Sequence, residues 1–123
     1  MKTTIAILSI FFSFFSLAKA AEPAKEESAA VTRLIDAVIS DDLGDFIKDG
    51  EPAFQKLTQE QLSAVSAQLK PRLENGYDTT YLGALTQQGY QVTLWRIRFK
   101  DGKDDALATL SMKDGKVGGF YLR

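Results

Sequence analysis

Three aromatic residues and one carboxylate in the second half of the chain have the composition of a small-molecule pocket. Tyr77, Tyr81 and Trp95 each combine an apolar body with one polar atom, as pocket-lining side chains often do. Asp78 adjoins Tyr77 at the start of a predicted strand, where burial would suit it to act as a general base. The alternatives are ordinary core packing for the aromatic residues and a solvated strand edge for Asp78.

A second group of polar residues is expected together on one face of a sheet. Arg96 and Arg98 alternate with apolar residues, and Thr109, Ser111 and Tyr121 have the matching parity on later strands. Guanidinium and hydroxyl groups arranged in this way would bind an anionic ligand or an acidic protein surface. The alternatives are a solvated sheet face and a dimer contact.

The composition excludes several kinds of chemistry. The 123 residues include no histidine and no cysteine, so the commonest general base near neutral pH, thiolate nucleophiles, disulfides and sulfur-ligated metals are all excluded. Asp104 and Asp105 are adjacent, but they lack the alternating oxygen ligands of a calcium loop. We therefore expect no metal and no cofactor.

The first twenty residues have the pattern of a signal peptide. Lys2 precedes an apolar run over residues 5–18, and small residues at Ala18 and Ala20 fit a signal peptidase site. The run is too short to span about 30 Å of hydrocarbon. We expect cleavage after Ala20 and a periplasmic or extracellular protein without stable membrane insertion. A retained membrane anchor is the alternative.

Length and charge restrict the domain organisation and the partners. Loss of Lys2 and Lys19 leaves 13 basic side chains against 16 acidic ones, a net charge of −3. Nucleic acids and anionic membranes require a concentrated basic surface, so we expect neither as a partner. The remaining 103 residues suit one domain. We expect a flexible leader over residues 21–28 and a single domain over residues 29–123.

Hydrophobic spacing predicts helices in the first half of the mature chain. Asp41 or Asp42 can cap a short second helix, and residues 58–61 form a capping box for a third, which Pro71 should kink or end. The first helix spans about residues 26–40, with five apolar residues on one stripe: Val31, Leu34, Ile35, Val38 and Ile39.

After Gly76 the hydrophobic period falls to two, which predicts strands. Turn sequences at Gln88-Gly89, Asp101-Gly102 and Asp114-Gly115 separate them and would join antiparallel neighbours. We therefore predict an α+β fold, with two to three N-terminal helices packed on one face of a four-stranded antiparallel meander sheet. The predicted strands cover residues 77–86, 90–100, 106–113 and 116–122.

Alternation along the second strand assigns side chains to the two faces. Trp95, Ile97 and Phe99 should face the helices, whereas Arg96 and Arg98 should face away. Residues of the last two strands extend the inner set: Ala108, Leu110, Met112, Phe120 and Leu122.

Several of these features occur together in one known superfamily. An amphipathic helix followed by Asp45-Phe46, a helix opened by Leu57-Thr58, a strand bearing Trp95, and a closing segment over residues 114–120 resemble small secreted domains of the nuclear transport factor two-like superfamily. The resemblance implies a cone-shaped α+β roll, a pocket between helices and curved sheet, and dimerisation through the sheet. Members similar to ketosteroid isomerase carry a pocket acid and a tyrosine, but no such pair aligns here.

Three functions are consistent with the sequence. The first, which we favour, is a noncatalytic module that binds a small molecule or a protein through the pocket or the sheet face. The second is a small isomerase- or hydratase-like enzyme that uses Asp78 and a tyrosine. It would require an enclosed cavity, and a space filled by Trp95 and Phe99 would argue against it. The third is a structural homodimer.

Overall fold

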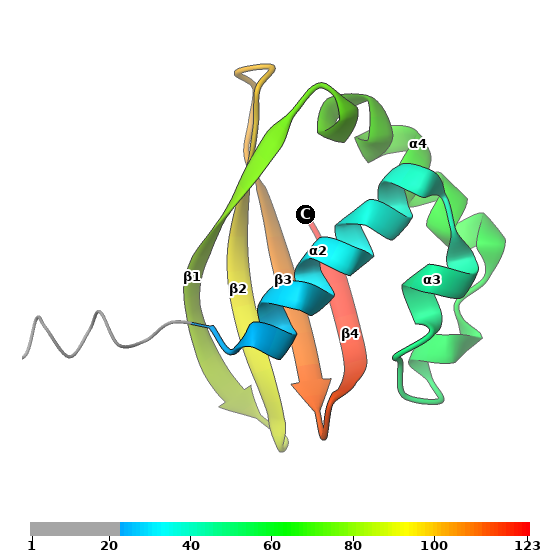
Figure 1. The fold of residues 1–123 in the computed structure, drawn as a ribbon, viewed down its shortest axis with the longest axis vertical. Helices are drawn as coiled ribbons and strands as arrows, with labels where there is room; N and C mark the ends of the chain where they lie inside the picture. Colours follow the sequence, from blue (N-terminus) through cyan, green and yellow to red (C-terminus); the bar gives the residue numbers. More distant parts are fainter. Residues whose placement is uncertain (1–22) are drawn as a thin grey trace, which may run out of the picture.

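A computed structural model describes residues 23–123, which form a helical layer on a four-stranded sheet (Figure 1). The predicted α+β fold is confirmed, because within residues 23–123 three α-helices precede an antiparallel meander in the order β1-β2-β3-β4. Helix α2 crosses one face of the sheet, and α3 and α4 pack against α2. The elements are α2 (Lys25–Ser40), α3 (Leu43–Ile47), the 3-10 helix η1 (Phe54–Lys56), α4 (Gln59–Glu74), β1 (Tyr77–Gln87), β2 (Tyr90–Phe99), β3 (Ala106–Lys113) and β4 (Lys116–Leu122).

Helix α2 begins earlier than the predicted domain boundary. Residues 25–28, expected in the flexible leader, form its first turn, where Glu26 and Glu27 complement the positive end of the helix dipole. The rest of the predicted leader, residues 21–24, is described only from residue 23. Four residues of the predicted apolar stripe are buried and the fifth, Ile39, is partly buried against the core, with Leu34 fully inaccessible to solvent. The helix ends at Ser40, and its C-cap residue, Asp41, takes a left-handed φ of 54°.

Helix α4 has the predicted capping box but does not end at Pro71. The Gln61 N–H donates to Thr58 Oγ1 at 3.2 Å, and the Thr58 N–H donates to Gln61 Oε1 at 2.9 Å. The helix continues through Pro71 to Glu74. Pro71 and Ala67 are both exposed, so water can reach the Ala67 carbonyl, which proline leaves without a backbone donor.

Two β-bulges interrupt the strand alternation. The register between β1 and β2 shifts after Tyr81, so Leu82 is an extra residue. The register between β3 and β4 shifts between Ser111 and Met112, so Gly118 is extra. The second bulge lets both Val117 and Phe120 face the helices, although three positions separate them.

The core lies between the helices and the inner face of the sheet. Trp95, Ile97 and Phe99 are buried there, as predicted, at 5%, 2% and 2% exposure. The Trp95 Nε1–H donates to Thr93 Oγ1 at 2.9 Å, which satisfies the one polar atom of the indole. The rest of the predicted inner set also contacts this core: Ala108, Leu110, Met112, Phe120 and Leu122.

A loop extends the free side of β4 at its beginning. The Glu51 N–H donates to the Val117 carbonyl, and the Val117 N–H donates to the Asp49 carbonyl, both at 2.8 Å. Gly50 therefore forms a parallel bridge with Val117. This pairing places the Glu51 side chain beside Gly118, within reach of the outer face of the sheet.

An ion pair ties the end of α4 to the β2–β3 turn. Arg72 Nε donates to Asp101 Oδ2 at 2.7 Å, and the guanidinium lies 3.8 Å from the centroid of the Phe99 ring. The hydrogen bond from Arg72, with a second from the Lys103 N–H, lowers the pKa of Asp101 from 3.8 to about 2.

Replacing Asp101 with asparagine should therefore change how stability depends on pH. A pKa lowered by folding contributes stability above the unfolded value, and that contribution is lost as pH falls through the folded one. Above pH 5 the wild-type protein should have the higher urea midpoint, and the difference should shrink between pH 4 and pH 2. Asp78→Asn, at an exposed position, is the control. A difference that stays constant down to pH 2 would contradict the assignment.

The predicted signal peptide, residues 1–20, lies outside the described residues. Among residues 23–123, no helix combines the length and apolar character needed to cross a bilayer.

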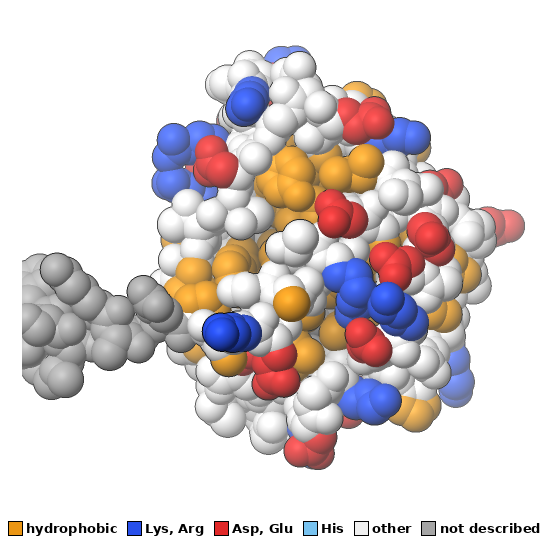
Figure 2. All heavy atoms as spheres, viewed as in Figure 1, with side chains coloured by type: hydrophobic (Ala, Val, Ile, Leu, Met, Phe, Trp, Pro, Cys, Tyr) orange, Lys and Arg blue, Asp and Glu red, His pale blue; other side chains and the backbone are white. Residues whose placement is uncertain are grey.

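On the side of the molecule that the helices cover, acidic and basic side chains are interspersed (Figure 2).

Candidate functional site

The sheet has an outer face, opposite to the one that the helices cover. Cross-strand register places Val92 opposite Ser111, and Ser111 opposite Gly119. Because side chains alternate along a strand, these positions lie on the side away from Trp95. The predicted division of the sheet into an inner apolar face and an outer face is therefore correct for β2 and β3.

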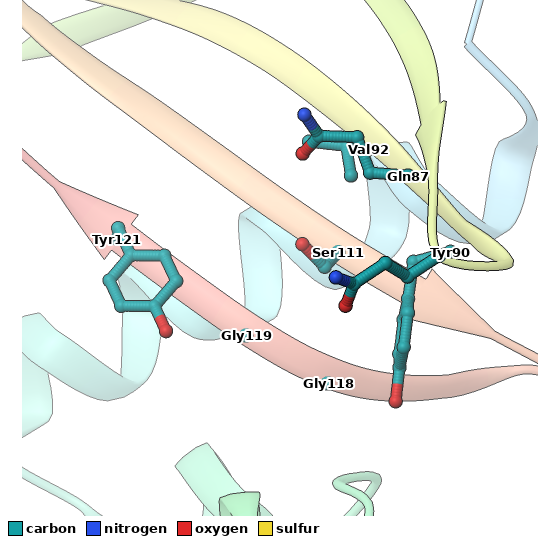
Figure 3. A pocket seen from close by; sticks show the side chains of 8 residues that line it. Gln87, Tyr90, Val92, Ser111, Gly118, Gly119 and Tyr121 are labelled. Carbon is teal, nitrogen blue, oxygen red and sulfur yellow. The ribbon is translucent and has the colours of Figure 1, made fainter.

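A groove with a volume of about 580 Å³ opens on this outer face (Figure 3). Tyr121 lies on one side, Tyr90 lies on the other, and Ser111 lies between them. Val92 is only 6% exposed although it belongs to the outer face, so the centre of the groove is sheltered. We call this site the tyrosine groove. Its eight lining residues are all uncharged: Gln87, Gln88, Tyr90, Val92, Ser111, Gly118, Gly119 and Tyr121.

One wall of the tyrosine groove is held in place by a hydrogen bond. The Tyr90 hydroxyl donates to Glu51 Oε1 at 2.5 Å, which joins the β1–β2 hairpin to the loop beside β4. This hydrogen bond, together with burial and the Glu51 charge, raises the pKa of the Tyr90 phenol. The Lys113 ammonium lies 5.5 Å from the centroid of the Tyr90 ring. The ring is thus oriented without a ligand.

The two glycines of β4 make room for the tyrosine rings. A Cβ atom on Gly118 would lie 2.5 Å from Tyr90 Cε2 and 2.8 Å from Glu51 Oε1. A Cβ atom on Gly119 would lie 3.1 Å from Tyr121 Cε2. Each ring therefore packs close to backbone that carries no side chain, as expected where a strand glycine marks a close approach.

The side chains that line the tyrosine groove offer stacking surfaces and hydrogen-bonding groups and carry no charge. Tyr121 is 61% exposed, so its ring is available to a ligand. Gln87, Gln88 and Ser111 supply amide donors, amide acceptors and a hydroxyl. This set suits a neutral ligand that has apolar surface and many hydroxyl or amide groups.

The predicted aromatic pocket lies on the inner face and is occupied by its own side chains. Trp95 is buried, and the Tyr81 ring packs edge-on against it with centroids 5.3 Å apart. Tyr77 and Tyr81 are partly buried against the core. Figure 2 shows hydrophobic atoms between α2 and β1, on the side of the sheet to which both tyrosines belong. Asp78 is exposed on the outer face, paired in register with Arg98.

The predicted cationic face is divided by the structure. Ser111 and Tyr121 belong to the tyrosine groove, whereas Arg96 and Arg98 lie further along β2, towards its C-terminal end. Arg98 is exposed, and Arg96 Nε is buried without a hydrogen-bond partner among residues 23–123. Thr109 pairs in register with Tyr121. The structure therefore does not bring the two arginines together with Ser111.

Sequence reasoning missed six of the eight groove residues, Val92 among them. Tyr90 shares the parity of Arg96 and could have been placed on the outer face. The Gly118-Gly119 pair inside a strand could have indicated a bulge or close approach. Gln87 follows the first predicted strand and Gln88 belongs to a predicted turn, and nothing in the local pattern relates them to β4.

Within the described part of the chain, no group of three or more acidic side chains is arranged to hold a metal ion. The Asp104 carbonyl instead accepts from Arg72 Nη2 at 2.7 Å. This contact helps to hold the β2–β3 turn against the end of α4.

Comparison of the sequence with protein-family models finds no match, and comparison with curated proteins finds no significant one.

Proposed function

We propose that this chain is an exported, noncatalytic binding module that takes a neutral, hydroxyl-rich ligand, of the oligosaccharide class, in the tyrosine groove. The observation that carries this proposal is the uncharged groove between the fixed Tyr90 ring and the exposed Tyr121 ring, floored by Gly119. The apolar face of a sugar ring would stack on a tyrosine, and its hydroxyls would bond to the Gln87 and Ser111 side chains.

Removing the Tyr121 ring, which forms the exposed wall of the tyrosine groove, tests this proposal. Tyr121→Ala should weaken binding of a neutral trisaccharide such as maltotriose or chitotriose about tenfold or more, because it removes one stacking surface. Titration followed by amide NMR shifts should perturb Ser111 and Gly119. The matched control is Leu82→Ala, because Leu82 is 54% exposed at the β1 bulge and does not line the groove.

Two results would count against the proposal. Shifts confined to residues outside the tyrosine groove would mean that the ligand binds elsewhere. Equal affinities of the wild-type protein and the Tyr121→Ala variant would mean that the ring is no part of the site.

The enzyme alternative receives less support from the geometry. It depends on an enclosed cavity that contains a carboxylate facing Tyr81, yet the Tyr81 ring packs against Trp95, and both Trp95 and Phe99 are buried in the core. Asp78 points to the other side of the sheet from Tyr81. An α+β roll of the nuclear transport factor two-like kind remains our proposal for the ancestry of the fold.

A homodimer formed through the outer sheet face is the second candidate. Large apolar side chains are exposed there and at the β1 edge, with Leu82 at 54%, Leu85 at 40% and Tyr121 at 61%. Such a dimer would cover the tyrosine groove. Light scattering over a range of concentrations separates the two, because a strict monomer leaves the groove accessible and excludes the dimer.

A further inference from the structure

A second cavity lies at the other end of the helical layer. It has a volume of about 270 Å³ and lies where the first turn of α2 meets the β1–β2 and β3–β4 turns. We call it the Glu27 cavity. Its lining residues are Glu26, Glu27, Thr86, Gly89, Gln91, Met112, Lys113, Asp114 and Gly115. The tyrosine groove has none of these residues, so the two sites are separate.

The Glu27 cavity contains a buried carboxylate with one oxygen that the described part of the chain leaves without a hydrogen-bond partner. Glu27 is only 6% exposed, and its Oε2 atom has no hydrogen-bond partner among residues 23–123. Burying a carboxylate oxygen without a partner costs free energy, so most buried carboxylates are paired or hydrogen-bonded. The position of Glu27 in the first turn of α2 lowers that cost but gives Oε2 no direct partner.

The other walls define the kind of group that would complete the site. Glu26 and Asp114 add negative charge at the cavity, and Thr86 and Gln91 add neutral oxygen atoms. Met112, 7% exposed, supplies an apolar wall. A primary ammonium has three N–H donors and therefore matches several oxygen acceptors at once, while the chain that carries it would pack on the methionine.

We infer that the Glu27 cavity binds a primary ammonium group on a short alkyl chain, with Glu27 as its charged partner. The ligand class is that of alkyl amines, including the side chain of a lysine presented by another molecule. This inference does not depend on the proposed function of the tyrosine groove.

Lys113 is a competitor within the chain, because it also lines the cavity. Its ammonium is placed 5.5 Å from the centroid of the Tyr90 ring. The described residues form three salt bridges, and none of them joins Lys113 to Glu27. Removing this lysine should therefore leave the cavity able to bind an amine, or make binding tighter.

The experiment is a titration with n-butylammonium, with n-butanol as the neutral probe of the same chain length. Amide and methyl NMR shifts of Gly89, Gly115 and Met112 should respond to the amine and much less to the alcohol. Glu27→Gln should weaken amine binding at least tenfold, because a buried charge-assisted hydrogen bond is lost. Asp36→Asn, at an exposed position of α2 that does not line the cavity, should alter it less than threefold.

Two further measurements test the inference: the melting temperature of Glu27→Gln and the binding of the amine by Lys113→Met. The melting temperature of unliganded Glu27→Gln should be equal to or above that of the wild type, because an unpaired buried charge is removed. Lys113→Met should bind the amine at least as tightly as the wild type. The inference is overturned if Glu27→Gln binds the amine as well as the wild type does, if Lys113→Met abolishes binding, or if the shifts occur only in the tyrosine groove.

Discussion

Leu34→Ala is expected to lower the free energy of unfolding by about 3–4 kcal/mol, the largest single effect that we predict. Leu34 lies in the middle of α2 and is fully buried in the core between the helices and the sheet. Truncation removes buried apolar surface and leaves a cavity that the surrounding helices and strands can only partly fill. Urea denaturation at neutral pH would measure the loss as a lower midpoint with an unchanged slope.

The control for this substitution is Asp36→Ala, on the exposed side of the same helix. It should change the free energy of unfolding by no more than about 0.5 kcal/mol. If the two variants were equally stable, the buried stripe of α2 would not pack on the sheet. A value near 1 kcal/mol for Leu34→Ala would mean that the core rearranges to fill the space.

Gly118→Ala is expected to lower stability by about 1–3 kcal/mol and to weaken oligosaccharide binding as well. The new Cβ atom would lie 2.5 Å from the Tyr90 ring and 2.8 Å from Glu51 Oε1, so both side chains must move. Movement of Tyr90 breaks its hydrogen bond to Glu51 and displaces one wall of the tyrosine groove. Chemical denaturation and NMR titration with the same trisaccharide would measure the two effects.

A second glycine-to-alanine substitution, at Gly44, serves as the control. It shows whether the effect of Gly118→Ala comes from the steric clash or only from the reduced freedom of the backbone. Gly44→Ala, in helix α3, brings its Cβ atom no closer than 3.5 Å to Asp42 Oδ1, an ordinary contact. Because alanine favours helix more than glycine does, this variant should gain about 0.5–1 kcal/mol. Binding of the trisaccharide should be unaffected. Unchanged Tyr90 shifts in Gly118→Ala would contradict the steric account.

The candidate site was partly predictable from alternation. The two-residue period of β2 and β3 correctly places Ser111 on the outer face and Trp95 on the inner face. Alternation did not show whether the pocket expected at Tyr77 and Tyr81 would be open. Both residues instead pack at the margin of the core. A local period identifies the face of a side chain, but it does not say whether that face is filled, covered or open.

The amino-acid sequence by itself determined the three α-helices, the four strands, their turns and the inward orientation of Trp95 and Phe99. These depend on spacing, capping and turn chemistry within a few residues. Only the tertiary structure decided the bulges at Leu82 and Gly118 and the contact between Tyr90 and Glu51, which are 39 positions apart. Those features arise from strand register and from a loop that joins the edge of β4. Contacts between distant segments depend on how whole elements pack, which no local pattern encodes.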